Sequence, residues 1–169
     1  FSNETFVFKL TEKNYNSDLV LRLAPTGYRV FPDYNLKKQV SIMKTLFSRG
    51  FPVPEVLFYE GNSSVIGSEF YIMNYIKGEA PSDNPPYHLD PDGMMGRADS
   101  KKRRNVWIDW LLYLSNLHNL DLKDISLDDF CEDDINGNPV ISDIEYYKNF
   151  LDWGMDGEPN NLCDDVINW

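Results

Sequence analysis

The chain changes character at Lys77, and this change constrains the fold more than any other feature of the sequence. Before it, short apolar runs alternate with turn-forming residues, a pattern typical of strands. Residues 77–100 are rich in proline and glycine, and from Lys101 onward the apolar residues recur with helical spacing. We therefore predict an α+β chain, with a mostly antiparallel sheet carrying one helix first and further helices afterwards.

The first 76 residues predict two hairpins separated by a helix. The four expected strands cover residues 5–11, 18–25, 51–61 and 68–78. The helix is expected over residues 34–49, with Asp33 as its N-cap and Gly50 just beyond its end. One face of this helix is apolar, so it is expected to pack on the sheet.

The second half predicts helices only. Lys101–His118 has an apolar side that includes Trp107 and Trp110, and we expect these aromatic residues to be core rather than a ligand cage. Ser142 and Glu145 form a capping box that predicts the start of another helix. That helix is expected to bury Ile144, Tyr147, Phe150 and Leu151. Residues 160–169 also have helical spacing.

Two polar residues interrupt these apolar faces. Arg22 lies within the apolar run Asp18–Pro25, and Gln39 lies within the apolar stripe of the expected helix. Burying an unpaired guanidinium costs roughly several kcal/mol, so Arg22 needs a partner or access to water. Arg22 and Gln39 either satisfy each other in the core or form a site between sheet and helix, and we expect them to face each other.

Composition excludes several classes of partner. The 169 residues include 16 basic and 27 acidic side chains, a formal net charge of −11, which disfavours nucleic acid and anionic membrane surfaces. No apolar run approaches the ~20 residues that span a bilayer. Cys131 and Cys163 have no spacing typical of a disulfide framework or a metal site, so we expect a reduced, cytoplasmic protein.

The ordered set of segments resembles one family of small-molecule kinases. The segments are "FSNETFVFKL", "LVLRLAP", "QVSIMKTL", "FPVPEVLFYE", "VIGSEFYIMNYIKGEAPSDNPPY" and "LSNLHNLDL". They are similar to the aminoglycoside phosphotransferase-like family, which has a protein-kinase-like fold, and to its branch of kinase-like domains attached to some acyl-CoA dehydrogenases. The resemblance implies a nucleotide-binding small lobe over residues 1–76, a hinge and linker over 77–100, and the start of a helical large lobe over 101–169.

The resemblance also implies roles for individual residues. Ser2 and Asn3 match the end of the family's phosphate-binding glycine-rich loop. Arg22 matches the basic residue that holds nucleotide phosphates, and Gln39 stands where the family usually has Glu, a departure that removes a negative charge.

The segment "MNYI" matches the hinge that reads adenine. The implied contacts are the Asn74 carbonyl and the Ile76 N–H, with Met73 lining the back of the pocket. The implied cofactor is ATP or GTP, with Mg²⁺ in the complete protein. The family's His-Gly-Asp catalytic run does not occur in these 169 residues, so no catalytic or metal-binding residue is assigned. His118 is expected to be structural, and His88 has no support beyond its place in the linker.

Two functions remain open at this stage. One is an ATP-dependent phosphotransferase of a small hydroxylated molecule, of which this chain is expected to be an inactive N-terminal fragment. The other is a non-catalytic, pseudokinase-like domain that binds nucleotide or another protein, which the Gln39 departure favours. The sequence does not give the substrate or the oligomeric state.

Overall fold

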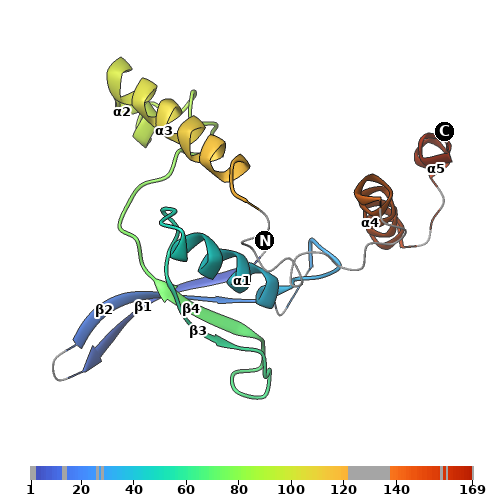
Figure 1. Cartoon of the computed structure of the whole chain (residues 1–169), viewed down its shortest axis with the longest axis horizontal. Coiled ribbons are helices and arrows are strands. Elements are labelled where there is room, and N and C mark those ends of the chain that lie inside the picture. Colours follow the sequence, from blue (N-terminus) through green and yellow to red (C-terminus); the bar gives the residue numbers. More distant parts are fainter. Residues whose placement is uncertain are drawn as a thin grey trace.

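A computed structural model describes residues 3–12, 15–25, 27, 29–121, 138–156, 158 and 160–168 (Figure 1). Ser2, Cys131 and most of the acidic loop after α3 lie outside the described residues. The strands are β1 (Glu4–Glu12), β2 (Tyr15–Leu23), β3 (Val56–Glu60) and β4 (Phe70–Asn74). The helices are α1 (Leu36–Ser48), α2 (Met94–Arg97), α3 (Ser100–His118), α4 (Pro139–Gly154) and α5 (Asn161–Asn168). This order confirms the predicted α+β class.

The four strands form one antiparallel sheet in the order β1-β2-β4-β3. The two hairpins therefore join through β2 and β4, which pair over the register Leu19–Asn74 to Leu23–Phe70. Directly opposed residues of an antiparallel pair point to the same face, so this register decides which side chains of distant segments meet.

Helix α1 covers one face of this sheet, with β3 and β4 as its main neighbours (Figure 1). Leu36 and Val40 of the helix pack on Val56 and Tyr71 of the sheet, and all four side chains are buried. Ala24, Met43, Tyr59 and Met73 surround this cluster. Apolar burial of this kind is the main force that holds a helix on a sheet.

The ends of α1 correct one prediction and confirm another. Asp33 is not the N-cap, because its carboxylate accepts from the adjacent Tyr34 N–H, while Asn35 Oδ1 accepts from Lys38 N–H at 2.8 Å. The helix therefore begins two residues later than expected. Gly50 follows the helix with φ +77°, the left-handed conformation that ends many helices, and its N–H donates to the Phe47 carbonyl.

The linker contains the short helix α2, which the sequence did not predict. Arg97 holds this region together, because its Nη2 contacts both carboxylate oxygens of Glu79 at 2.7 Å and its Nη1 contacts the Asp92 carbonyl. A side chain at Gly96 would collide with the Asp90 carbonyl, so glycine is needed for this close approach. Residues 75–99 thus connect β4 to α3.

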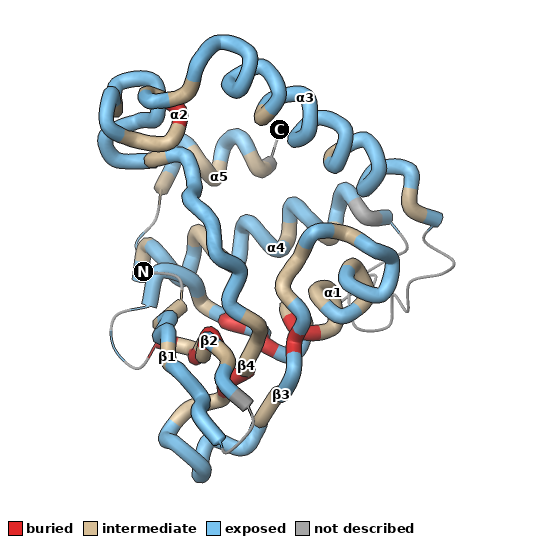
Figure 2. The backbone as a smooth tube through the Cα atoms, turned by 90° about the vertical axis from the view of Figure 1, so that its left-hand side faces the viewer, coloured by how far each residue is buried: buried red, intermediate tan, exposed pale blue. Residues whose placement is uncertain are grey.

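Helices α3, α4 and α5 bury little of their apolar surface. Figure 2 shows buried residues gathered where α1 meets the sheet, whereas these three helices are mainly exposed. Trp107 and Trp110 are exposed, so they are not part of a core among the described residues, and Ile144 and Tyr147 are exposed too. The helical spacing located these apolar faces, but among the described residues they are only partly covered, by the ring of Tyr87 on Trp107 and by α5 beside α4.

Helix α4 begins at Pro139 instead of Ser142. Asn138 is the N-cap, with its side chain accepting from Val140 N–H at 3.0 Å, and proline is favoured in the first turn because its missing N–H would be unsatisfied there. The expected capping box is therefore inside the helix, where Ser142 Oγ donates to the Asn138 carbonyl. A ring contact between Phe150 and Phe31 links α4 to the loop after β2.

Candidate functional site

Arg22 lies on β2 and points to the face of the sheet that α1 covers. Its register partner on β4 is Tyr71, which belongs to the core cluster under α1, so both side chains share that face. Arg22 is half-buried and its Nε atom is buried from solvent. The arginine predicted from the sequence therefore lies at the boundary between the sheet, the helix and solvent.

Tyr71 is a residue of this site that the sequence analysis missed. Its side chain is 0% exposed, and its hydroxyl donates to Met43 Sδ of α1 at 3.8 Å. Burial raises the pKa of Tyr71, while the charge of Arg22 and a hydrogen bond from its guanidinium act in the opposite direction. The signal that could have revealed Tyr71 is the β2–β4 register, which apolar patterning alone does not supply.

Gln39 and Asn3 are in direct contact. The Asn3 side-chain amide donates to Gln39 Oε1 at 3.3 Å. Asn3 comes just before β1, and Gln39 lies on α1 between the buried residues Leu36 and Val40. The structure therefore joins two of the predicted site residues across the start of β1 and the helix.

An apolar surface continues from Arg22 along the same face of the sheet. Val20 lies two residues before Arg22 on β2, and its register partners are Val7 on β1 and Met73 on β4. Val20 is buried, but Val7 is 61% exposed, so the β1 end of this surface is open to solvent. Met73 is partly buried against the cluster under α1.

The predicted hinge continues directly from β4. Asn74 N–H donates to the Glu55 carbonyl at 3.0 Å, and Tyr75 N–H donates to the Asp18 carbonyl at 3.2 Å. The Asn74 side chain donates to Glu55 Oε2, so it turns toward the β3 side. Ile76, the last residue of the predicted hinge, is 57% exposed.

The other candidates do not join this site. His88 lies in the linker against the ring of Tyr87, and His118 is the last residue of α3. Across the described ranges, no three His, Cys, Asp or Glu side chains come together in a way that could hold a metal ion. In the same ranges every helix is too short or too polar to cross a membrane.

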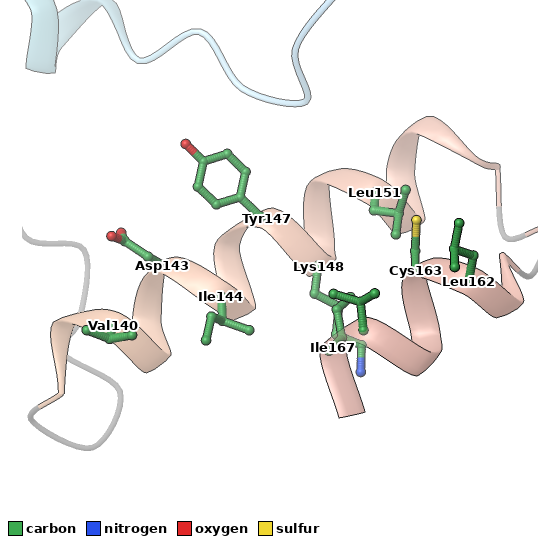
Figure 3. Close-up of a pocket in the computed structure, with 10 residues that line it drawn as sticks. Val140, Asp143, Ile144, Tyr147, Lys148, Leu151, Leu162, Cys163 and Ile167 are labelled. Atoms are coloured by element: carbon green, nitrogen blue, oxygen red, sulfur yellow. The ribbon is translucent and has the colours of Figure 1, made fainter. Parts of the chain in front are cut away.

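A separate apolar groove lies between α4 and α5 (Figure 3). Its volume is about 570 Å³, and Ile144, Tyr147, Leu151 and Leu162 line it. All of its lining residues belong to these two helices, so it is distinct from the surface near Arg22.

The chain is similar to known proteins over most of its length. A family model described as the phosphotransferase enzyme family matches residues 1–154. Acyl-CoA dehydrogenase family member 11 of Rattus norvegicus is 32% identical over 127 residues, which are 75% of this chain and 15% of that protein. Acyl-CoA dehydrogenase family member 10 of Mus musculus is 32% identical over 129 residues, 76% of this chain and 11% of that protein.

A solved structure shares the fold. It is the crystal structure of a protein of the aminoglycoside phosphotransferase type from Ralstonia eutropha, which is 19% identical and superposes with a TM-score of 0.59. The superposition covers 100% of this chain and 47% of that one. The chain therefore spans less than half of this structural relative, and a smaller share of the two mammalian proteins.

Proposed function

Because the chain belongs to the phosphotransferase enzyme family, we propose that it is the nucleotide-binding part of an ATP-dependent kinase of a small hydroxylated molecule. The observation that carries this proposal is the position of Arg22, on the α1 side of the sheet and next to an open apolar surface. A cation beside an apolar surface suits a nucleotide, which has an anionic end and a flat, largely apolar base.

The proposed phosphate site consists of Arg22 and the polar residues before β1. A guanidinium offers five N–H donors in a planar fork that matches phosphate oxygens. Asn3 is held near α1 by Gln39 and supplies an amide, and Ser2 would add a hydroxyl from outside the described residues. Together these groups would bind and orient the phosphates of ATP or GTP.

The proposed base site is the surface formed by Val7, Val20 and Met73, together with the hinge. If the backbone continues beyond β4 in extended form, the Asn74 carbonyl and the Ile76 N–H point in the same direction. Hydrogen bonding to one edge of adenine requires this arrangement. The exposure of Ile76 and Val7 supports this assignment. In this scheme the small lobe is residues 1–76, the linker 77–100, and the helical lobe begins at 101.

Mg²⁺, when bound to the nucleotide, would neutralise charge on the transferred phosphoryl group. Since the family's His-Gly-Asp run does not occur in these 169 residues, we assign the ligands of Mg²⁺ to other parts of the full-length polypeptide. On the same grounds this chain alone should not transfer phosphate. We propose a cytoplasmic enzyme, since Cys131 and Cys163 have no spacing typical of a disulfide framework. Its proposed partner is a hydroxylated small molecule and not nucleic acid, since the chain carries a net charge of −11.

The test begins with nucleotide binding to the full-length natural polypeptide. Arg22→Ala should weaken ATP binding by about 10- to 100-fold, the value of a hydrogen-bonded contact to a charged group. Lys44→Ala is the matched control, because Lys44 is an exposed cation on the same helix–sheet unit, and it should change ATP affinity little. Equal effects of the two variants would contradict the phosphate site.

Turnover is tested by ATP consumption with Mg²⁺ across aminoglycosides, choline-like alcohols, hydroxy acids and hydroxylated acyl-CoA thioesters. The thioesters are included because the relatives' names refer to acyl-CoA. We expect turnover with one class. The second candidate function is a pseudokinase-like nucleotide-binding domain, favoured by Gln39 where the family usually has Glu. ATP binding without turnover on any class would support it.

A further inference from the structure

We propose that Tyr71 is a positioning residue for Arg22, and that it couples the phosphate-binding arginine to helix α1. This inference rests on the proposed function of Arg22. It concerns a residue from β4 that reaches Arg22 only through the fold, since the two lie on strands from different hairpins.

The geometry begins with the sheet register. Arg22 and Tyr71 are directly opposed on β2 and β4, so their side chains are neighbours on the same face. The next residue across the sheet on that face is Tyr59 of β3, which prevents Tyr71 from moving sideways in that direction. Tyr71 is fully buried among Leu36, Val40 and Val56, so its ring has one fixed position.

The hydroxyl of Tyr71 has two different neighbours. It donates its proton to Met43 Sδ, which can act as a weak acceptor. An arginine can only donate, so the guanidinium of Arg22 is matched to the lone pairs that the Tyr71 oxygen keeps free. The proposed series is directional: the Arg22 guanidinium donates to the Tyr71 oxygen, and the Tyr71 hydroxyl donates to Met43 of α1.

This series has a consequence for phosphate binding. A long arginine side chain loses rotational freedom when it binds an anion, and that loss reduces affinity. A partner that already fixes the guanidinium lowers the loss, because the side chain is preorganised. Helix α1 is then connected to the phosphate site twice, through Met43 and Tyr71 to Arg22 and through Gln39 to Asn3.

The decisive experiment compares ATP with adenosine, which has no phosphate, in the full-length natural polypeptide. Tyr71→Phe keeps the buried ring and removes the hydroxyl. We expect ATP affinity to fall by about tenfold, as for loss of one hydrogen bond to a charged group, and adenosine affinity to stay within about twofold. A general structural defect would weaken both ligands alike, and this outcome would overturn the proposal.

Tyr59→Phe is the matched control. Tyr59 lies next to Tyr71 on the same face, but its hydroxyl donates to Glu69 Oε1 at 2.5 Å. This variant should leave the ratio of ATP to adenosine affinity unchanged. An equal change in that ratio for Tyr59→Phe and Tyr71→Phe would also overturn the proposal.

A double-mutant cycle provides a second measurement. If Tyr71 acts through Arg22, then Arg22→Ala combined with Tyr71→Phe should bind ATP no more weakly than Arg22→Ala alone. Additive losses would contradict the coupling. A different result would contradict the proposed function itself: the unmodified protein would bind ATP no more tightly than adenosine.

Discussion

The side-chain amide of Asn3 donates a 3.3 Å hydrogen bond to Oε1 of Gln39, and it thereby joins the residue before β1 to the middle of helix α1. Both residues were predicted site residues, but their contact with each other was not predicted. The side-chain amide of Gln39 therefore acts as the hydrogen-bond acceptor for Asn3 in this chain, although it carries no charge.

The first prediction concerns this contact. Gln39→Ala removes the acceptor for Asn3, and loss of a neutral hydrogen bond should weaken ATP binding by roughly 2- to 12-fold. Gln39→Glu keeps an acceptor at the same place and should retain the contact with Asn3. Titration with ATP measures both variants. If Gln39→Ala binds ATP as tightly as the unmodified protein, the contact does not support the phosphate site.

The second prediction concerns the start of α1. Asn35→Ala should lower the free energy of unfolding by about 1 kcal/mol, because Lys38 N–H loses its capping partner. Asn35→Asp keeps the capping oxygen and should be nearly neutral. Urea denaturation followed by circular dichroism measures the difference. A larger loss for Asp33→Ala than for Asn35→Ala would instead favour Asp33 as the cap.

The third prediction concerns the end of the same helix. Gly50 has φ +77° and open space where a side chain would stand, so Gly50→Ala introduces backbone strain without a collision. The expected loss is about 1–2 kcal/mol in the free energy of unfolding. Gly78→Ala is the control, because Gly78 also has open space but no positive φ. Equal stability of the two variants would contradict the argument.

The fourth prediction is a pH dependence. Burial, the hydrogen bond to Glu69 and the charges of Glu69 and Glu60 raise the pKa of Tyr59 from 10.0 to about 12. The protonated phenol is therefore favoured in the folded state, and its contribution is complete below pH 10 and is lost as the pH rises through 12. Denaturation at several pH values should show a smaller alkaline loss of stability for Tyr59→Phe than for the unmodified protein. Parallel curves would refute this assignment.

Much of the structure of residues 1–76 was predictable, because local patterns determine it. Alternation located the first strand and short apolar runs located the other three. Helical spacing located α1, and Gly50 marked its end. Arg22 and Gln39 were noticeable because each interrupts an apolar face. The cap was misassigned because Asp and Asn are both favoured at the N-cap position. Residue type alone does not determine the backbone conformation that decides between Asp33 and Asn35.

The rest depended on contacts between distant segments. Tyr71 sits in an apolar, aromatic run where it looks like an ordinary core residue, and only the pairing of β2 with β4 puts it beside Arg22. In α3 and α4 the apolar faces were read correctly from their spacing. Whether an apolar face is buried depends on what packs over it, and a periodic pattern contains no information about that partner.

Strand β4 has one further consequence, for how the protein carries mechanical load. It is paired on both sides, by β2 and β3, and it runs directly into the connection that leads to α3. A pull on that connection acts along the strand and loads its hydrogen bonds together, because those bonds run perpendicular to the strand. An edge strand at this position would be held by one ladder of hydrogen bonds instead of two. The sheet order therefore makes the attachment of the connection resistant to shear.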